Sequence, residues 1–257
     1  MSAVTSLGDD VFVVREYSQQ VEVYDAETLT LQRRIAVHGI RYPRGLVACP
    51  NNNCLYASDW RNNIHRVELS GSNDVQQWSV ASRPVGLSVN IAHNLVVACR
   101  GLETFCGVNM CTLKEYTTHG SLVRDIILQS GVTDPWHAIQ LSTGDYVVSQ
   151  FTAPGMVRIV GVDGRVIESY GQSQTSDVGQ MKFPSSLAVT KNDDILVASQ
   201  HNHRILSINR STGCVQELVD CRIYEPRGLC LDESRGRLYV GQVSGQCQVL
   251  VFDGVRL

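Results

Sequence analysis

The 257-residue sequence has no long hydrophobic segment, no CxxC pair and very little lysine. No apolar run approaches the roughly 18 residues that a membrane-spanning helix needs, so we expect no membrane insertion. The first residues, MSAVTSLGDD, lack the basic and apolar regions of a secretory signal peptide, which favours a cytoplasmic location. Only 3 of the 22 basic residues are lysine, and the formal net charge is −3. This balance argues against a general polyanion-binding protein but leaves room for a local basic face.

The nine cysteines lack the spacing of zinc ligands. Cys49 and Cys54 are separated by four residues, as are Cys106 and Cys111, and neither pair has a second pair at zinc-finger distance. We therefore expect buried free thiols in a reducing compartment, with no metal or other cofactor. A disulfide between Cys49 and Cys54 across a hairpin is the alternative.

A short signature recurs along the chain: a proline, usually a small residue two positions later, then an apolar run. A polar turn and a second apolar run follow each signature. The N-terminal residues fit the same frame without the proline, so the chain divides into six units of about 43 residues. The prolines are Pro43, Pro84, Pro135, Pro184 and Pro226.

Each unit contains four short apolar segments separated by turns rich in Gly, Asn and Asp, as antiparallel strands require. No long segment has helical periodicity. The pattern predicts one all-β domain over residues 1–257, a six-bladed β-propeller of four-stranded antiparallel blades. In the last unit the fourth strand is expected to be short or absent. The predicted blades span about 1–40, 41–81, 82–131, 132–180, 181–222 and 223–257.

Three stretches resemble the NHL repeat: LYASDWRNNIHRVEL (55–69), ILVASQHNHRILSIN (195–209) and LYVGQVSGQCQVLVFD (238–253). The resemblance implies a propeller similar to the C-terminal NHL domain of tripartite-motif proteins, where it is the recognition module behind a RING ubiquitin ligase. The chain has no RING, B-box or coiled-coil segment, so the likeness concerns only the ligand-binding end. The aspartate that ends the second strand in the family occurs only as Asp59. A shared turn-bracing role at this position is therefore in doubt.

Chain direction brings the starts of the first strands and the ends of the second strands to one end of the ring, which we call the top face. Arginines and aromatic residues gather there in the sequence pattern, whereas aspartates gather in the turns at the opposite end. We expect ligand contacts from residues at these positions: Arg15, Tyr17, Arg44, Asp59, Trp60, Arg61, Arg100, Trp136, His137, Gln150, Phe151, Gln200, His201, Arg227 and Gln242.

Arginine with aromatic residues is the composition of protein-interface hot spots. We therefore predict a non-catalytic, monomeric module that binds a protein or peptide. Single-stranded RNA is the alternative ligand, because it uses the same side chains. A metal-dependent lyase or lactonase is the second alternative, but a catalytic metal needs three protein ligands. The channel side of the first strands offers one histidine and no carboxylate: Gly45, Gly86, His137, Ser186 and Gly228.

His201 and His203, in VASQHNHR, would share one face of a strand and could form a metal-binding pair. An alignment of His203-Arg204-Ile205 with His65-Arg66-Val67 instead makes the stretch a blade corner. On that interpretation His203 is structural, and His201 is the better candidate for a ligand contact.

Overall fold

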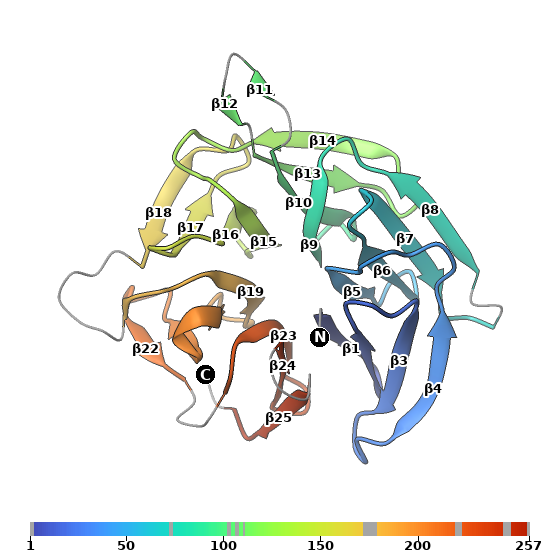
Figure 1. Cartoon of the computed structure of the whole chain (residues 1–257). Coiled ribbons are helices and arrows are strands. Elements are labelled where there is room, and N and C mark those ends of the chain that lie inside the picture. The colour runs from blue at the N-terminus through green and yellow to red at the C-terminus, as the bar shows by residue number, and fades with distance from the viewer. Residues whose placement is uncertain are drawn as a thin grey trace.

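The computed structural model of the protein describes residues 3–71, 74–101, 104–105, 108–109, 111–171, 179–218, 223–243 and 248–255. Their strands form six antiparallel sheets arranged as blades around a central axis (Figure 1). Five sheets have four strands, and the sixth has three among the described residues. The prediction of an all-β, six-bladed propeller is confirmed.

Each blade is built from strands that follow one another along the chain. Blades 1 to 3 contain β1 (Ala3–Leu7), β2 (Asp10–Val14), β3 (Gln20–Asp25) and β4 (Leu31–Ala36); β5 (Leu46–Cys49), β6 (Cys54–Ser58), β7 (Asn63–Glu68) and β8 (Val75–Ser79); β9 (Arg83–Val89), β10 (Leu95–Arg100), β13 (Thr112–Tyr116) and β14 (Leu122–Ile127). Blades 4 to 6 contain β15 (Pro135–Gln140), β16 (Tyr146–Gln150), β17 (Met156–Val160) and β18 (Val166–Tyr170); β19 (Pro184–Val189), β20 (Ile195–Ser199), β21 (Arg204–Ile208) and β22 (Val215–Glu217); β23 (Pro226–Asp232), β24 (Arg237–Gln242) and β25 (Val249–Asp253). A small extra hairpin, β11 (Thr104–Phe105) with β12 (Val108–Asn109), stands outside the ring in Figure 1.

Apolar side chains of the second and third strands fill the spaces between blades. All five residues of β6, β16 and β20 are buried, because both faces of these central strands are covered by neighbouring blades. Aromatic rings continue the packing: Trp78 on β8 lies 6.2 Å from Tyr56 and 6.3 Å from Tyr116 of the next blade, measured between ring centroids. The resulting ring holds the first strands rigidly around the axis.

The ring closes by packing blade 6 against blade 1. Val4, Val11 and Val13 of blade 1 form one apolar cluster with Tyr239 of β24. On the acidic side of the ring, Arg235 of blade 6 donates to Asp9 at 2.5 Å and to Glu27 at 3.0 Å, both in blade 1. Closure therefore uses side chains, and no strand of the described residues is shared between the two blades.

The cysteines within the described residues are free thiols. Cys49 and Cys54 are opposite one another across the β5–β6 hairpin, and both are buried and unbridged. Cys99 and Cys111 are buried as well. Cys230 is partly buried, and Cys214 is exposed, so the expectation of a buried thiol is wrong for Cys214. Cys106, Cys221 and Cys247 lie outside the described residues.

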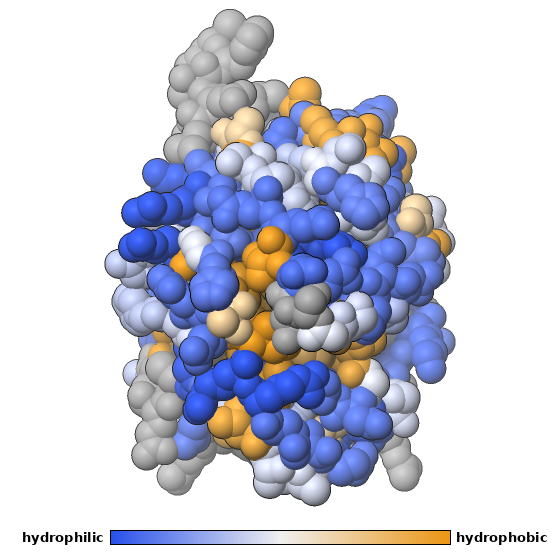
Figure 2. All heavy atoms as spheres, turned by 90° about the vertical axis from the view of Figure 1, so that its right-hand side faces the viewer, coloured by the Kyte–Doolittle hydropathy of each residue, from blue (hydrophilic) through white to orange (hydrophobic). Residues whose placement is uncertain are grey.

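The outer rim is mainly polar on the side formed by blades 1 and 2 (Figure 2). Figure 2 shows the side of the ring formed by blades 1 and 2, where hydrophilic side chains dominate and apolar ones gather in a band near the middle. Among the described residues, no helix is long and apolar enough to cross a membrane.

Two glycines on the first strands provide a matched test of the packing at the axis. A Cβ on Gly86 would lie 2.7 Å from the Cα of His137 and closer still to the carbonyl oxygen of Trp136. A Cβ on Gly228 would meet its nearest neighbours at 3.4 to 3.5 Å, an ordinary contact. We expect Gly86→Ala to lower the free energy of unfolding by about 1–3 kcal/mol, and Gly228→Ala to change it little. Urea unfolding of the two variants checks this; equal effects would contradict it.

Candidate functional site

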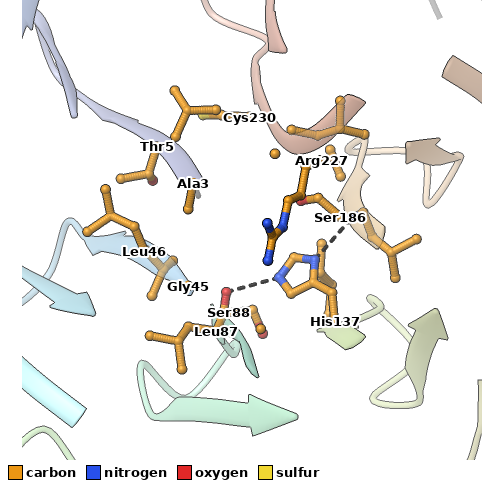
Figure 3. A pocket seen from close by; sticks show the side chains of 18 of the residues that line it. Ala3, Thr5, Gly45, Leu46, Leu87, Ser88, His137, Ser186, Arg227 and Cys230 are labelled. Carbon is orange, nitrogen blue, oxygen red and sulfur yellow. Dashed lines mark hydrogen bonds between the residues drawn. The ribbon is translucent and has the colours of Figure 1, made fainter. Parts of the chain in front are cut away.

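The top face centres on a cavity of about 230 Å³ along the propeller axis (Figure 3). The first strands of the blades form its wall. Arg44, Trp136 and Arg227 come at or just before the starts of these strands, so they stand at the top end of the cavity. All five residues that the sequence placed on the channel side line it: Gly45, Gly86, His137, Ser186 and Gly228.

A repeated backbone corner brings the two parts of the top face together. The residue before the signature proline has a left-handed φ of 46° to 52° in four blades, an uncommon conformation for residues other than glycine. The carbonyl groups of three of these residues accept hydrogen bonds from the loop after the second strand of the same blade; for example, Asp134 accepts from the backbone N–H of Phe151 at 2.9 Å. This corner was not predicted from the sequence, although the aligned prolines mark its place. The four residues are Tyr42, Asp134, Phe183 and Glu225.

Arginines and tryptophans from blades 2, 3, 4 and 6 meet around the cavity entrance. The guanidinium carbon of Arg44 lies 4.1 Å from the ring centroid of Trp60 and 5.9 Å from that of Trp136. Arg227 and Arg100 lie 5.1 and 5.8 Å from the same Trp136 ring. Such cation–π contacts orient the guanidinium groups. We call six residues the mouth cluster: Arg44, Trp60, Arg83, Arg100, Trp136 and Arg227.

A row of rings extends from the mouth cluster toward blade 5. Trp136 stacks on Phe151 at 4.2 Å between centroids, Phe151 meets Phe183 at 5.1 Å, and Phe183 meets His201 at 4.4 Å. Phe151 is thereby placed beside Trp136, and His201 lies at the other end of the same row. Trp136 itself is only 7% exposed and supports the row from beneath.

Positive charge exceeds negative charge in the mouth cluster. Arg100 is paired with Asp134, and Arg227 has Glu16 at 3.8 Å. No carboxylate of the described residues lies within 4 Å of the Arg44 guanidinium. Burial and repulsion from Arg227 lower the pKa of Arg44 to about 10, so the group stays charged at neutral pH. Burial also lowers the pKa of Arg227.

Besides Trp136, four other residues expected on the top surface are buried, which corrects their assignment as surface ligand contacts. They end the second strands of blades 2, 4, 5 and 6, and their side chains turn inward beneath the loops. Gln150, for example, donates from Nε2 to the Thr133 carbonyl at 2.9 Å. The four are Asp59, Gln150, Gln200 and Gln242, with exposed fractions of 0%, 2%, 8% and 8%.

Asp59 braces the loop between β6 and β7. Its carboxylate accepts hydrogen bonds from the backbone N–H groups of Arg61 at 2.8 Å and Asn63 at 2.9 Å, and from Nε2 of the buried His65 at 3.1 Å. Burial alone would raise the pKa of Asp59, but the hydrogen bonds from His65 and Asn63 outweigh it and hold the pKa below its usual range. The turn-bracing role that the sequence left in doubt is therefore present in blade 2.

The remaining predicted contacts lie around the rim of the top face. Tyr17 is 81% exposed and packs edge-on against Tyr42. Arg61 is exposed in the loop after β6. Arg15 pairs with Glu22 at 2.9 Å and lines a separate space between blades 1 and 6. Of these three, Arg15 is turned away from the mouth cluster.

His137 links three blades at the cavity wall. Its Nε2–H donates to the carbonyl oxygen of Leu87 in blade 3 at 3.0 Å, and its Nδ1 accepts from the backbone N–H of Leu187 in blade 5 at 3.0 Å (Figure 3). Both ring nitrogens are thus engaged, and binding a metal would require breaking one of these bonds. Among the described residues, no three His, Cys, Asp or Glu side chains are grouped as metal ligands.

Burial lowers the pKa of His137, because removal from water disfavours the charged form of the ring. Protonation of Nδ1 would set one N–H donor against that of Leu187. The contribution of the neutral His137 ring to the stability of the fold is complete above the pKa of an unfolded histidine, about 6.5. This contribution is lost as the pH falls below that value. We expect the thermal midpoint to fall by about 2–4 °C between pH 7 and pH 5.5, and His137→Gln to lack this component. Parallel pH profiles of the two proteins would contradict the assignment.

The two histidines of VASQHNHR do not form a metal-binding pair. His203 takes a left-handed φ of 58° after the short helix η2 (Gln200–Asn202), accepts at Nδ1 from the Glu225 N–H at 3.1 Å, and stacks on Tyr224. His201 is exposed and contacts Phe183 instead. The stretch is a blade corner in which His203 has a structural role.

The alignment of His203 with His65, from which the blade corner was predicted, is wrong by two residues. In β7, His65 pairs with Ala57, and in β21 the residue that pairs with the matching Ala198 is Ile205. His65 therefore corresponds to Ile205, and not to His203. Both stretches contain His-Arg, but the loop before the third strand differs in length between the two blades.

Solved structures match the whole architecture. A protein of unknown function from Bacteroides caccae is similar with a TM-score of 0.72 at 15% identity, over 94% of this chain and 89% of that chain. A chain of a nidogen/laminin complex matches with a TM-score of 0.72 at 14% identity, over 94% and 88%. A catalytically inactive virginiamycin B lyase from Staphylococcus aureus, solved with quinupristin, matches with a TM-score of 0.69 at 12% identity, over 97% and 78%.

What these chains share with this protein is the propeller fold. No protein-family model matches the sequence, and no curated protein matches it. At such low sequence identities, the ligand or activity of a similar structure cannot be assigned to this chain. Function must be argued from the residues of the top face.

Proposed function

We propose that this propeller is a non-catalytic recognition module that binds a protein or peptide on its top face. The observation that carries the proposal is the mouth cluster, in which guanidinium groups in excess of nearby carboxylates are held against indole rings. Arginine and tryptophan are the residues that dominate the energetics of protein interfaces. The exposed rings of Tyr17, Tyr42 and Trp60 extend this surface outward.

Two further observations support recognition over catalysis. Among the described residues, the cavity wall has one histidine, whose ring nitrogens are both in hydrogen bonds, and no carboxylate. A similar propeller occurs in a nidogen/laminin complex, which supports the use of this fold for protein binding. The neighbouring lyase is the argument for an enzyme, but it shares only the fold.

We extend the proposal to the cellular role: the domain acts in the cytoplasm, as a monomer, as the substrate-recognition end of a ubiquitin-ligase-type protein. This part rests on the resemblance of residues 55–69, 195–209 and 238–253 to the NHL repeat of tripartite-motif proteins.

Affinity purification from native cells, with and without nuclease, tests the proposal. We expect a protein partner that survives nuclease and weakens little between about 50 and 200 mM salt. An RNA ligand making six to ten phosphate contacts would lose roughly 10³–10⁵ in affinity over that range. Nuclease-sensitive capture would overturn the protein ligand in favour of single-stranded RNA, and capture of no partner would overturn the top-face proposal itself.

A further inference from the structure

The axial cavity differs in character between its entrance and its wall. At the entrance stand the guanidinium groups of Arg44 and Arg227, and Figure 3 shows the Arg227 side chain directed toward the middle of the cavity. Farther along the axis the wall is mainly apolar, with side chains such as Leu46, Leu87 and Leu187 between the glycines, but it also includes polar groups, among them Ser88 and His137. A molecule that satisfies both parts has a negative charge at one end and an apolar body.

The guanidinium groups of Arg44 and Arg227 at the entrance have few partners within the protein. Nε of Arg227 is buried without a hydrogen-bond partner among the described residues, and the nearest carboxylate, on Glu16, is 3.8 Å from its Nη1. Arg44 has contacts to the two tryptophan rings and no carboxylate of the described residues within 4 Å. Guanidinium groups bind carboxylates through paired N–H donors.

A second unpartnered group lies within the cavity. Ser88 is 6% exposed and lines the cavity wall, and its Oγ has no hydrogen-bond partner among the described residues. A buried hydroxyl without a partner costs free energy that a ligand can recover by hydrogen bonding to it. This observation is independent of the arginines, and it too points to an occupant.

The size of the cavity limits that occupant. Its volume of about 230 Å³ exceeds the 150 Å³ of an engineered cavity that binds benzene but is smaller than the 300–1,000 Å³ of drug-sized sites. One amino-acid residue is of this size. The aromatic row through Phe151 and Phe183 begins at the same entrance, where the rest of a peptide would leave the cavity.

We propose that Arg44 and Arg227 bind the C-terminal carboxylate of a peptide whose last, apolar side chain enters the axial cavity. This inference rests on the proposed function and names the part of the ligand that the top face recognises. The carboxylate takes the place opposite the two guanidinium groups.

The electrostatics of Arg44 agree with this assignment. Burial and the Arg227 charge lower the pKa of Arg44 to about 10, which means that the protein destabilises the charged form there. A bound carboxylate would reverse this effect, because an opposite charge at short distance favours the charged guanidinium.

A peptide pool tests the proposal directly. N-acetylated hexapeptides, randomised at every position, are made once as free acids and once as C-terminal amides and are passed over the immobilised protein. We expect free acids that end in an apolar residue to be enriched at least tenfold over the amides. Arg44→Met and Arg227→Met should each lose this enrichment. Arg33→Met, at an arginine of the outer strand β4, should keep it.

The variants are checked for wild-type thermal midpoints, and the two mouth substitutions serve as independent tests should one of them fail to fold. Equal recovery of acids and amides, no preference at the last residue, or enrichment that persists in both mouth variants would overturn the inference. Displacement by millimolar inorganic phosphate but not by N-acetyl-leucine would overturn it in favour of a phosphate ligand. A cellular partner still captured by Arg44→Met and Arg227→Met would leave the proposed function standing and the carboxylate site refuted. Capture of no partner by the wild type would refute the proposed function independently of the peptide result.

Discussion

Reversal of both charges in Arg44→Glu/Arg227→Glu is expected to abolish capture of the cellular ligand while leaving the propeller folded. Both residues stand at the cavity entrance beside Trp136. Two interface hot spots of about 2 kcal/mol each correspond to a roughly 1,000-fold loss of affinity, and like-charge repulsion of an acidic ligand adds to it. The fold should tolerate the change, because the new carboxylates would face the remaining arginines of the mouth cluster.

A control with the same change in net charge separates a local effect from a general one. Arg33→Glu/Arg165→Glu places the reversals on the outer strand β4 and in the turn before β18, away from the top face. We expect this variant to bind like the wild type. Retained binding by a folded Arg44→Glu/Arg227→Glu protein, measured by the same affinity purification, would refute the top face as the ligand site.

The largest loss of stability is expected from Asp59→Ala. The substitution removes the acceptor for three backbone N–H groups, those of Arg41, Arg61 and Asn63, and for the buried Nε2 of His65. Each buried donor left without its acceptor costs about 1–3 kcal/mol. We therefore expect a total loss of about 3–5 kcal/mol, which corresponds to a fall of roughly 6–20 °C in the thermal midpoint of a chain of this size. Differential scanning calorimetry measures the difference.

Gln200→Ala is the matched control, because Gln200 occupies the same place after the second strand of blade 5. Its Oε1 is buried without a partner among the described residues, so we expect a loss of about 1 kcal/mol or less. The pKa of Asp59 is lowered in the fold, so its contribution is present above the unfolded value of about 3.9 and is lost as the pH falls below it. The gap between wild type and Asp59→Ala should therefore narrow below about pH 4. Equal losses from the two alanine variants would contradict the bracing role.

The repeat made the fold predictable from the sequence. Its prolines and paired apolar runs recur at the period of a propeller blade, and strand alternation then assigns each residue to the top or to the opposite end. Arg44, Trp136 and Arg227 could be placed on one face by this argument alone. Contact between their side chains could not be predicted, because they come from three different blades and converge only when the ring is closed.

The prediction from the repeat was wrong where side-chain direction mattered. It treated Asp59, Gln150, Gln200 and Gln242 as surface residues because they end strands on the top face, yet the loops above cover them. It also aligned His203 with His65 on shared letters, whereas strand pairing sets the correspondence two residues away. A one-residue difference in loop length is invisible in a single sequence but shifts every partner that follows.

The sequence by itself determined the number of blades, the direction of each strand and the end of the ring on which the arginines and aromatic residues gather, because these properties depend on local periodicity. The tertiary structure alone decided which side chains face the cavity, which brace loops and which arginines lack a carboxylate within reach. Those properties depend on contacts between blades that are distant in the chain. Binding chemistry at the axis of a propeller is therefore a property of the closed ring, to which each blade contributes only one or two residues.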